Sequence, residues 1–300
     1  MNTTASLGTR WRQARRPSVA VVTCQKYPHL YEEDRPLLGA LRERGIAARP
    51  VLWDSPDVAW QDHDLVLVRS PWDYPSRPRE FLAWYQGVST VTTIINSYAA
   101  VQSNQHKSYL RDLWHAGAPV IPTEVIKRPS AAARVVAQCG WPEAVLKPAI
   151  SMGGRGVHRL SSADLKALDA SSTGDWVVQP LLRRVQDEGE FSLVYINGRP
   201  SHAVRKVPAR GEIRIQEAHG GAHAPYPLGL ELLAVGDAII DAARARDELI
   251  VRVDLIRNDE GDLLLGELEL TSPRLFFCHH GSAIRTLADA IYARLAQTDN

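Results

Sequence analysis

The chain has 300 residues, of which 45% are apolar and 23% charged, and its formal net charge is +1. This composition is typical of a globular protein and excludes a mainly disordered chain, a collagen and a coiled coil. The balanced charge disfavours a dedicated nucleic-acid-binding protein, and no apolar run approaches the ~18 residues of a membrane span.

Charge and cysteine patterns bear on where the protein works. The first 31 residues hold five basic residues and no acidic one, which leaves 30 basic against 34 acidic residues in the remainder. We expect residues 1–17 to form a basic, disordered leader, since they lack the apolar core of a secretory signal; a transit peptide is the alternative. Three widely spaced cysteines without a Cys-x-x-Cys pair favour reduced thiols in the cytoplasm and argue against a zinc ribbon.

The first part of the chain alternates between apolar strands and helices. Leu37, Leu38 and Leu41 recur at helical spacing before Gly45, which predicts a helix that ends there. The predicted strands are 19–23, 48–52, 65–68 and 93–96, and the predicted helices are 32–44 and 98–116. Strands alternating with helices indicate a parallel sheet with crossover helices.

After Pro119, strands joined by tight turns replace this alternation. A strand over 145–148 is joined by a glycine-rich turn, 151–156, to a strand over 157–160. This order predicts a hairpin and differs from the strand–loop–helix order of a P-loop. Further predicted strands are 176–179, 191–196, 249–256 and 263–270, and further predicted helices are 229–246 and 282–296.

Three acidic residues are predicted to share one face of the last strand pair. Asp254 lies in one strand and Glu267 and Glu269 in the next, and residues two apart on a strand point to the same side. If the strands pair as a hairpin, the three carboxylates converge and need a counter-cation to stay ionised. Hard oxygen ligands suit Mg²⁺, which substrate phosphates usually complete. A solvated face with alternating acids is the alternative.

Two basic features could complement a phosphate. Lys147 emerges from an apolar strand just before the glycine-rich turn, where an ammonium group is costly without an anionic partner. The glycines would let backbone N–H groups approach phosphate oxygens. Arg205, Lys206, Arg210 and Arg214 form a basic stretch that could hold phosphates or a carboxylate. An ordinary turn and ordinary surface charge are the alternatives.

In combination and in order, these segments resemble the ATP-grasp ligases. The segment 267–273, Glu-Leu-Glu-Leu-Thr-Ser-Pro, is similar to Glu-Ile-Asn-Val-Thr-Ser-Pro of bacterial glutathione synthetases. The run Arg-Lys-Val-Pro at 205–208, with Arg214 and the His-Gly-Gly of 219–221, resembles their Arg-Ile-Pro…Arg-Gly-Asn…Gly-Gly stretch. Glu-Phe-Ser at 190–192 resembles Glu-Phe-Thr of D-alanine–D-alanine ligases. The similarity spans residues 65–281.

The sequence departs from the family pattern at three positions. Glu269 replaces the metal-site asparagine and adds a negative charge, and Gln216 stands where the family has the asparagine of Arg-x-Asn. Pro180 lies in the expected adenine hinge and has no N–H group to offer. These departures make a metal role less secure for Glu269 than for Asp254 or Glu267.

The resemblance implies an α/β ATP-grasp fold. An N-terminal parallel-sheet domain, 18–117, would be followed by two α+β subdomains, 118–182 and 183–300, that clasp ATP. The implied cofactors are ATP and Mg²⁺, with two ions, and the implied substrate is a small amino-acid-like molecule. The implied reaction forms a C–N bond through an acyl phosphate, and it needs no covalent nucleophile from the protein. We therefore expect no catalytic cysteine.

The resemblance also implies roles for individual residues. The implied nucleotide contacts are Lys107, Lys147, the loop from Ser151 to Gly156 with Gly153 and Gly154, the hinge from Gln179 to Leu182, and Glu190 on the ribose. The implied metal ligands are Asp254, Glu267 and Glu269, and the implied catalytic residues are Arg205, Arg214 and Lys147. His279 and His280 could supply a base, or could form a buried or solvated pair.

Substrate-binding residues are expected at the ends of the first and third strands, where open α/β sheets place their ligand crevice. Arg69 could bind a carboxylate there and Asp73 an ammonium group, and Arg274 lies beside the metal strand. The motif Pro-Trp-Asp-Tyr at 71–74 and the chain length resemble the branch that closes O-ureido-D-serine to D-cycloserine.

Other functions stay open at this stage. One alternative is an intermolecular ligase of the glutathione-synthetase type, and another is a non-catalytic nucleotide-binding protein, which the intact lysines and carboxylates disfavour. We expect a cytoplasmic protein without a nucleic-acid or membrane partner, and a homodimer is one expectation for its assembly.

Overall fold

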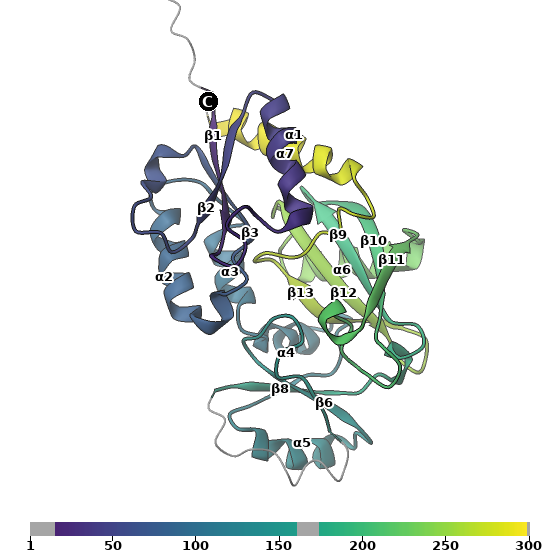
Figure 1. Ribbon diagram of the computed structural model, residues 1–300. Helices are drawn as coiled ribbons and strands as arrows, with labels where there is room; N and C mark the ends of the chain where they lie inside the picture. The colour runs from purple at the N-terminus through teal and green to yellow at the C-terminus, as the bar shows by residue number, and fades with distance from the viewer. Residues whose placement is uncertain (1–15, 161–173, 299–300) are drawn as a thin grey trace, which may run out of the picture.

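Three β-sheets follow one another along the described part of the chain (Figure 1). The computed structural model describes residues 16–160 and 174–298. The predicted leader, 1–17, therefore lies outside the described residues except for Arg16 and Pro17. None of the described helices is both long enough and apolar enough to cross a bilayer.

The first sheet is parallel and carries helices on both faces. Its strand order is β2-β1-β3-β4, with β1 (Ser18–Thr23), β2 (Ala47–Leu52), β3 (Leu65–Ser70) and β4 (Ile94–Ile95). Helix α1 (Arg35–Glu43) and the C-terminal helix α7 (Ser282–Thr298) pack on one face, and α2 (Pro78–Ser89) packs on the other. All residues of β3 are buried, because helices cover both faces of the sheet. A strand in this position must be nearly all apolar.

The continuous helix predicted over 98–116 is wrong. The structure has two helices, α3 (Tyr98–Asn104) and α4 (Ser108–His115), separated by residues 105–107. Val101 of α3 packs in the core of the first sheet, whereas Leu110 of α4 packs in the core of the third. The chain must turn between the two cores, and this turn places Lys107 at the start of α4.

The second sheet contains the predicted hairpin. Its strand order is β5-β8-β6-β7, with β5 (Glu124–Ile126), β6 (Ala144–Pro148), β7 (His158–Leu160) and β8 (Trp176–Pro180). β6 and β7 pair antiparallel on either side of the glycine-rich turn, which confirms the hairpin. Helix α5 (Ala132–Cys139), which the sequence analysis did not predict, covers the apolar core of this sheet.

The third sheet is antiparallel and has one apolar and one charged face. Its strand order is β11-β10-β9-β12-β13, with β9 (Glu190–Ile196), β10 (Arg199–Val207), β11 (Ala222–Tyr226), β12 (Ile250–Arg257) and β13 (Leu263–Glu269). Leu193 and Tyr195 point toward α6 (Leu230–Ala242). A Cβ on Gly236 of α6 would lie 2.5 Å from atoms of both side chains, so this close packing requires glycine. β10 and β11 were not predicted.

The C-terminal helix returns to the first sheet. α7 lies beside α1 (Figure 1), and Leu287 and Ile291 pack in the same cluster as Val19 and Leu41. Ile196 of β9 joins this cluster as well, so the first and third sheets share a core. The division into units 18–117, 118–182 and 183–300 stays a prediction.

Candidate active site

The charged face of the third sheet brings the three predicted metal ligands together. Asp254 of β12 lies directly opposite Glu267 of β13, and Arg252 lies opposite Glu269. Side chains alternate along a strand, so these four residues point away from α6. Ser192 of β9 flanks Asp254 on the other side and donates a hydrogen bond to its Oδ1 at 2.5 Å.

Protein cations already balance these carboxylates. Arg252 donates from Nε and Nη2 to the two oxygens of Asp254, at 2.9 and 2.7 Å, and it also pairs with Glu269. Lys206 Nζ lies 3.4 Å from Asp254 Oδ2 and pairs with Glu190. Burial alone would raise the pKa of Asp254, but the charges of Arg252 and Lys206 hold that pKa well below its usual range. A metal is therefore not needed to keep Asp254 ionised, which corrects the argument made from the sequence.

Sequence reasoning missed Arg252 as part of the site. The signal was available, because Arg252 precedes Asp254 by two residues on the same strand and must share its face. Lys206 was noted only as a member of the basic stretch. Its place opposite Glu190 depends on the pairing of β9 with β10, a strand that was not predicted.

Two lysines from different elements converge on Glu267. Lys107 Nζ lies 3.1 Å from Glu267 Oε1 and donates to the carbonyl oxygen of Ser151 at 2.7 Å. Lys147 Nζ donates to the carbonyl oxygen of Gly266, the unpaired residue at the register shift in β13, at 3.2 Å. Burial would raise the pKa of Glu267, but the two lysines lower it. Four carboxylates and four cations thus face one another: Glu190, Asp254, Glu267 and Glu269 with Lys107, Lys147, Lys206 and Arg252.

Burial lowers the pKa of Lys147 to about 8, although the charge of Glu267 opposes the shift. The lysine is therefore charged below pH 8 and loses its charge as the pH rises through that value. If Lys147 binds a phosphate, affinity for Mg·ATP should be constant below pH 8 and fall above it, by up to about tenfold per pH unit for one proton.

Titration of the protein with Mg·ATP between pH 6.5 and 9.5 measures this dependence. The matched control is Lys147→Arg, whose guanidinium stays charged over the whole range. A wild-type affinity that is the same at pH 7 and pH 9.5 would remove Lys147 from the phosphate site.

The glycine-rich loop packs against the segment that carries Arg214. Gly153, Gly154 and Gly156 all have positive φ, at 65°, 73° and 70°, a conformation that favours glycine. A Cβ on Gly154 would lie 2.5 Å from Gln216 Oε1. A cavity of about 380 Å³ opens between residues 156–159 and 211–214, and Arg214 lines it while pairing with Glu212 at 2.6 Å.

Four predicted nucleotide or catalytic residues are held in other contacts. Arg205 Nη2 donates to the carbonyl oxygen of Asp187 at 2.7 Å, and its neighbour Lys206 occupies the charged face instead. Gln179 Nε2 donates to Thr123 Oγ1 at 2.8 Å. Glu190 pairs with Lys206, and burial nevertheless raises the pKa of this carboxyl to about 7. Leu182 follows β8 and accepts a hydrogen bond from the Val185 N–H at 3.2 Å.

The expectation that Arg69 binds a substrate carboxylate needs correction, whereas that for Asp73 is not contradicted. Arg69 has no exposed surface, and it donates to Asp34 Oδ1 from Nε at 3.0 Å and from Nη2 at 2.8 Å. Asp73 accepts hydrogen bonds from Trp53 Nε1 and Arg77 Nη2, both at 2.9 Å. Arg69 is closed inside the core and is not available to a substrate carboxylate. The side chain of Asp73 is 32% exposed, so its role toward an ammonium group stays a prediction.

The predicted crevice edge is instead lined by aromatic rings. Tyr27 follows β1, Trp72 follows β3, and Tyr31 lies between them, with ring centroids 5.5 and 4.9 Å from Trp72. Trp72 Nε1 donates to the carbonyl oxygen of Ser272 at 3.0 Å, which ties this edge to the segment after β13. Arg274 lies over the Tyr31 ring and pairs with Glu217 at 2.8 Å.

The residues present fit a magnesium nucleotide. Asp254 and Glu267 offer hard oxygen atoms from adjacent strands, which are the ligands that Mg²⁺ takes in proteins. Lys107 pairs with Glu267 from beside the glycine-rich loop, and the charge of Lys147 acts on the same carboxylate, so positive charge is present where phosphate oxygens would need it. The arrangement suits phosphoryl transfer, in which positioning and charge stabilisation supply most of the catalysis.

Two family models match the chain in succession. Residues 19–96 match the N-terminal domain of D-cycloserine synthetase, and residues 115–277 match the ATP-grasp domain of prokaryotic glutathione synthetase. The second match covers more than half of the chain and includes Lys147 and all three carboxylates, whereas Lys107 lies between the two matched ranges.

Known proteins are similar over nearly the full length. The cycloserine biosynthesis protein DcsG of Streptomyces lavendulae is 31% identical over 283 residues, which cover 87% of this chain and 93% of that protein. The crystal structure of D-cycloserine synthetase DcsG superposes with a TM-score of 0.83 at 29% identity and covers 93% of this chain and 99% of that one. The ATP-grasp ligase PsnB, solved with Mg and ADP, is 20% identical with a TM-score of 0.65 over 93% and 99% of the chains, and it shows the fold alone. The chain therefore belongs to the ATP-grasp ligases and, among them, to the D-cycloserine synthetase family.

Proposed function

We propose that this ligase closes O-ureido-D-serine on its own carboxylate to give D-cycloserine, with ATP converted to ADP and phosphate. The observation that carries the proposal is the match of residues 19–96 to the N-terminal domain of D-cycloserine synthetase. These residues form the first sheet and its crevice edge, the part of an open α/β fold where ligands bind. The match of residues 115–277 to the ATP-grasp domain would not by itself identify the substrate.

The chain's own groups have distinct tasks in this reaction. Mg·ATP supplies the phosphoryl group and the positive charge that activate the substrate carboxylate as an acyl phosphate. Asp254 and Glu267 would hold the metal, and Lys107 and Lys147 would offset charge on the phosphates. Arg214, in the wall of the cavity beside the glycine-rich loop, would bind the phosphoryl group or the carboxylate under activation. The loop would exclude water from the acyl phosphate.

Charge balance supports two Mg²⁺ ions. The four carboxylates and four cations of the charged face sum to about zero, so the site offers no net charge to the nucleotide. ATP carries about four negative charges, which two Mg²⁺ ions would neutralise and one would not. A buried site favours the neutral combination, because an uncompensated charge is costly there.

Ring closure is internal to one substrate. The ureido nitrogen that is bonded to the side-chain oxygen of the substrate would attack the activated carboxyl carbon. The phosphate would leave and take one of the two carboxyl oxygens with it. D-cycloserine lacks the carbamoyl group, so hydrolysis must also release that group as carbon dioxide and ammonia. A tethered nucleophile reaches effective molarities of about 10⁵ M or more when well oriented, so the protein needs only to hold the substrate bent.

The decisive measurement is the product mass with O-ureido-D-serine and Mg·ATP as the sole substrates. We expect D-cycloserine with equal amounts of ADP and phosphate. The control replaces O-ureido-D-serine by its L enantiomer. ADP release that begins only after a separate amine is added would contradict the cyclisation.

That second outcome would favour an intermolecular ligase. The match of residues 115–277 to the glutathione synthetase domain supports this alternative, because those enzymes share the ATP-grasp half. The two functions differ in the number of substrates. Omitting each candidate amine in turn therefore separates them. A cytoplasmic location and a homodimer remain predictions.

The glycine-rich loop should become protected when nucleotide binds. Lys107 holds the loop at the carbonyl of Ser151, beside the lysines expected at the phosphates, so we expect the loop to close over the phosphates. Hydrogen exchange of residues 149–157 should slow on addition of Mg·ATP, whereas exchange in α1, which carries none of the proposed nucleotide or metal contacts, should not change. Equal exchange with and without nucleotide would count against a lid.

A further inference from the structure

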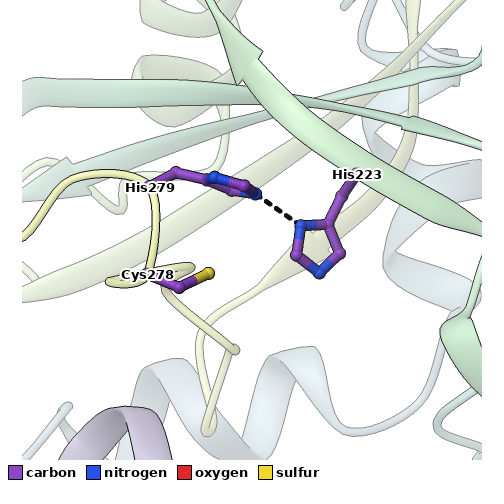
Figure 2. A group of neighbouring side chains, drawn as sticks. All are labelled: His223, Cys278 and His279. Carbon is purple, nitrogen blue, oxygen red and sulfur yellow. Dashed lines mark hydrogen bonds between the residues drawn. The ribbon is translucent and has the colours of Figure 1, made fainter.

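Three potential ligands for a transition metal gather outside the nucleotide site. His223 lies on β11, and Cys278 and His279 lie in the segment between β13 and α7; Figure 2 shows the three side chains turned toward one another. One ligand atom of each lies within 4.8 Å of the others. His223 pairs in register with Lys206, so it belongs to the charged face, at the edge of the sheet opposite β13.

We propose that His223, Cys278 and His279 form a binding site for a borderline-soft divalent metal ion such as Zn²⁺. Two imidazole nitrogens and a thiolate are ligands that Zn²⁺ takes readily, whereas Mg²⁺ prefers oxygen. The site is therefore chemically distinct from the carboxylate site at Asp254. Three protein ligands leave the fourth tetrahedral position to water or a small anion. No four-cysteine ribbon is involved.

Glu217 supplies the support that a metal-bound histidine usually has. Its Oε1 lies 2.7 Å from Nε2 of His223, while Nδ1 of the same ring faces Nε2 of His279 at 2.6 Å. A histidine that donates its outer N–H to a carboxylate presents the other nitrogen as a lone pair, the arrangement common around bound metals. Arg274 donates to the second oxygen of Glu217 at 2.8 Å and fixes its orientation.

A simple hydrogen bond between the two histidines is the competing explanation. It accounts for the 2.6 Å separation of His223 and His279, and the thiol of Cys278 beside them has Glu33 as its hydrogen-bond partner, a contact that a thiolate bound to a metal would give up. Two nitrogen ligands of one tetrahedral ion lie about 3.3 Å apart, so metal binding requires the rings to separate by about 0.7 Å. Arg274 opposes the positive charge of an ion, and the carboxylates of Glu33 and Glu217 that pair with Arg274 offset it.

Occupancy would tie an edge strand to the chain leading into α7. β11 pairs with β10 on one side. The segment that carries Cys278 and His279 comes later in the chain and lies beside His223 of β11 (Figure 2). Zn²⁺ should therefore raise the temperature of unfolding, because an ion that binds only the folded state stabilises it.

Cobalt titration of the full-length protein tests the proposal without reference to ligase activity. After removal of metals with a chelator and under reducing conditions, Co²⁺ should give a thiolate-to-cobalt absorption band and visible bands of a tetrahedral site. Zn²⁺ should displace the Co²⁺, and excess Mg²⁺ should not. Failure of this test would leave the proposed ligase reaction untouched.

Variants identify the ligands. Cys278→Ser should abolish the thiolate band, and Cys139→Ser, at the other exposed cysteine of the described residues, should leave it intact. His223→Ala and His279→Ala should each abolish the tetrahedral bands, and Glu217→Gln should weaken Zn²⁺ binding by about 10- to 100-fold. The absence of a thiolate band in the wild type, or its persistence in Cys278→Ser, would overturn the proposal.

Discussion

Asp254→Asn and Glu267→Gln should each lower turnover by about 10²-fold or more, which corresponds to ~3 kcal/mol of transition-state stabilisation. Both side chains offer hard oxygens on adjacent strands, and both stand among the lysines expected at the phosphates. The amides keep the shape of the carboxylates but lose the charge that would hold Mg²⁺. The measurement is steady-state ADP release at saturating Mg·ATP and over a range of Mg²⁺ concentrations.

Two controls separate a metal role from a structural one. Asp259→Asn changes an exposed aspartate at the turn of the same hairpin and should leave turnover unchanged. Glu269→Gln should lose less activity than Asp254→Asn, because Glu269 stands where the glutathione synthetases have a neutral asparagine, and glutamine is likewise a neutral amide. Turnover within threefold of wild type in either principal variant would remove that residue from the metal site.

Arg69→Met should destabilise the protein by about 3–5 kcal/mol, the usual cost of removing one partner of a buried ion pair. Arg69 and Asp34 have side-chain exposures of 0% and 3%, so the substitution would leave a carboxylate with no solvent and no cation. Arg69 also donates to the carbonyl of Pro273 at 3.0 Å, which links the first sheet to the segment after β13. The free energy of unfolding in urea measures the effect.

The double variant Asp34→Leu with Arg69→Met should recover much of this loss, since a buried ion pair can often be replaced by apolar side chains of similar volume. Arg44→Met serves as the matched control. Arg44 pairs with Asp289, whose side chain is 69% exposed, and such a pair contributes about 1 kcal/mol or less. A loss below 1 kcal/mol in Arg69→Met would show that the pair is not needed for the fold.

The carboxylate site was predictable because strand alternation is a local property. Asp254, Glu267 and Glu269 needed only the period of two and an antiparallel hairpin to share a face. The same rule would have included Arg252. The place of Lys107 rested on resemblance alone, since nothing in its neighbourhood says that the chain turns there from one core to another.

The substrate side was less predictable because burial decides what an arginine does. Arg69 at the end of a strand has the same sequence context whether it faces a crevice or an aspartate 35 residues earlier in the chain. The partner, Asp34, comes from the start of α1, and only the packing of that helix shows that the pair is closed. The cluster of His223 with Cys278 and His279 joins segments more than 50 residues apart, which no spacing rule connects.

The position of α7 bears on how the protein is made. The first sheet is synthesised early, yet one of its faces is covered by Leu287, Ile291 and Leu295, which lie among the last residues of the chain. A nascent chain on the ribosome therefore carries an exposed apolar surface on its first sheet until α7 has been made, and domains that stay incomplete in this way attract chaperones and aggregate. For the same reason, residues 19–96 expressed alone would lack this cover, and a deletion from the C-terminus would damage the N-terminal sheet.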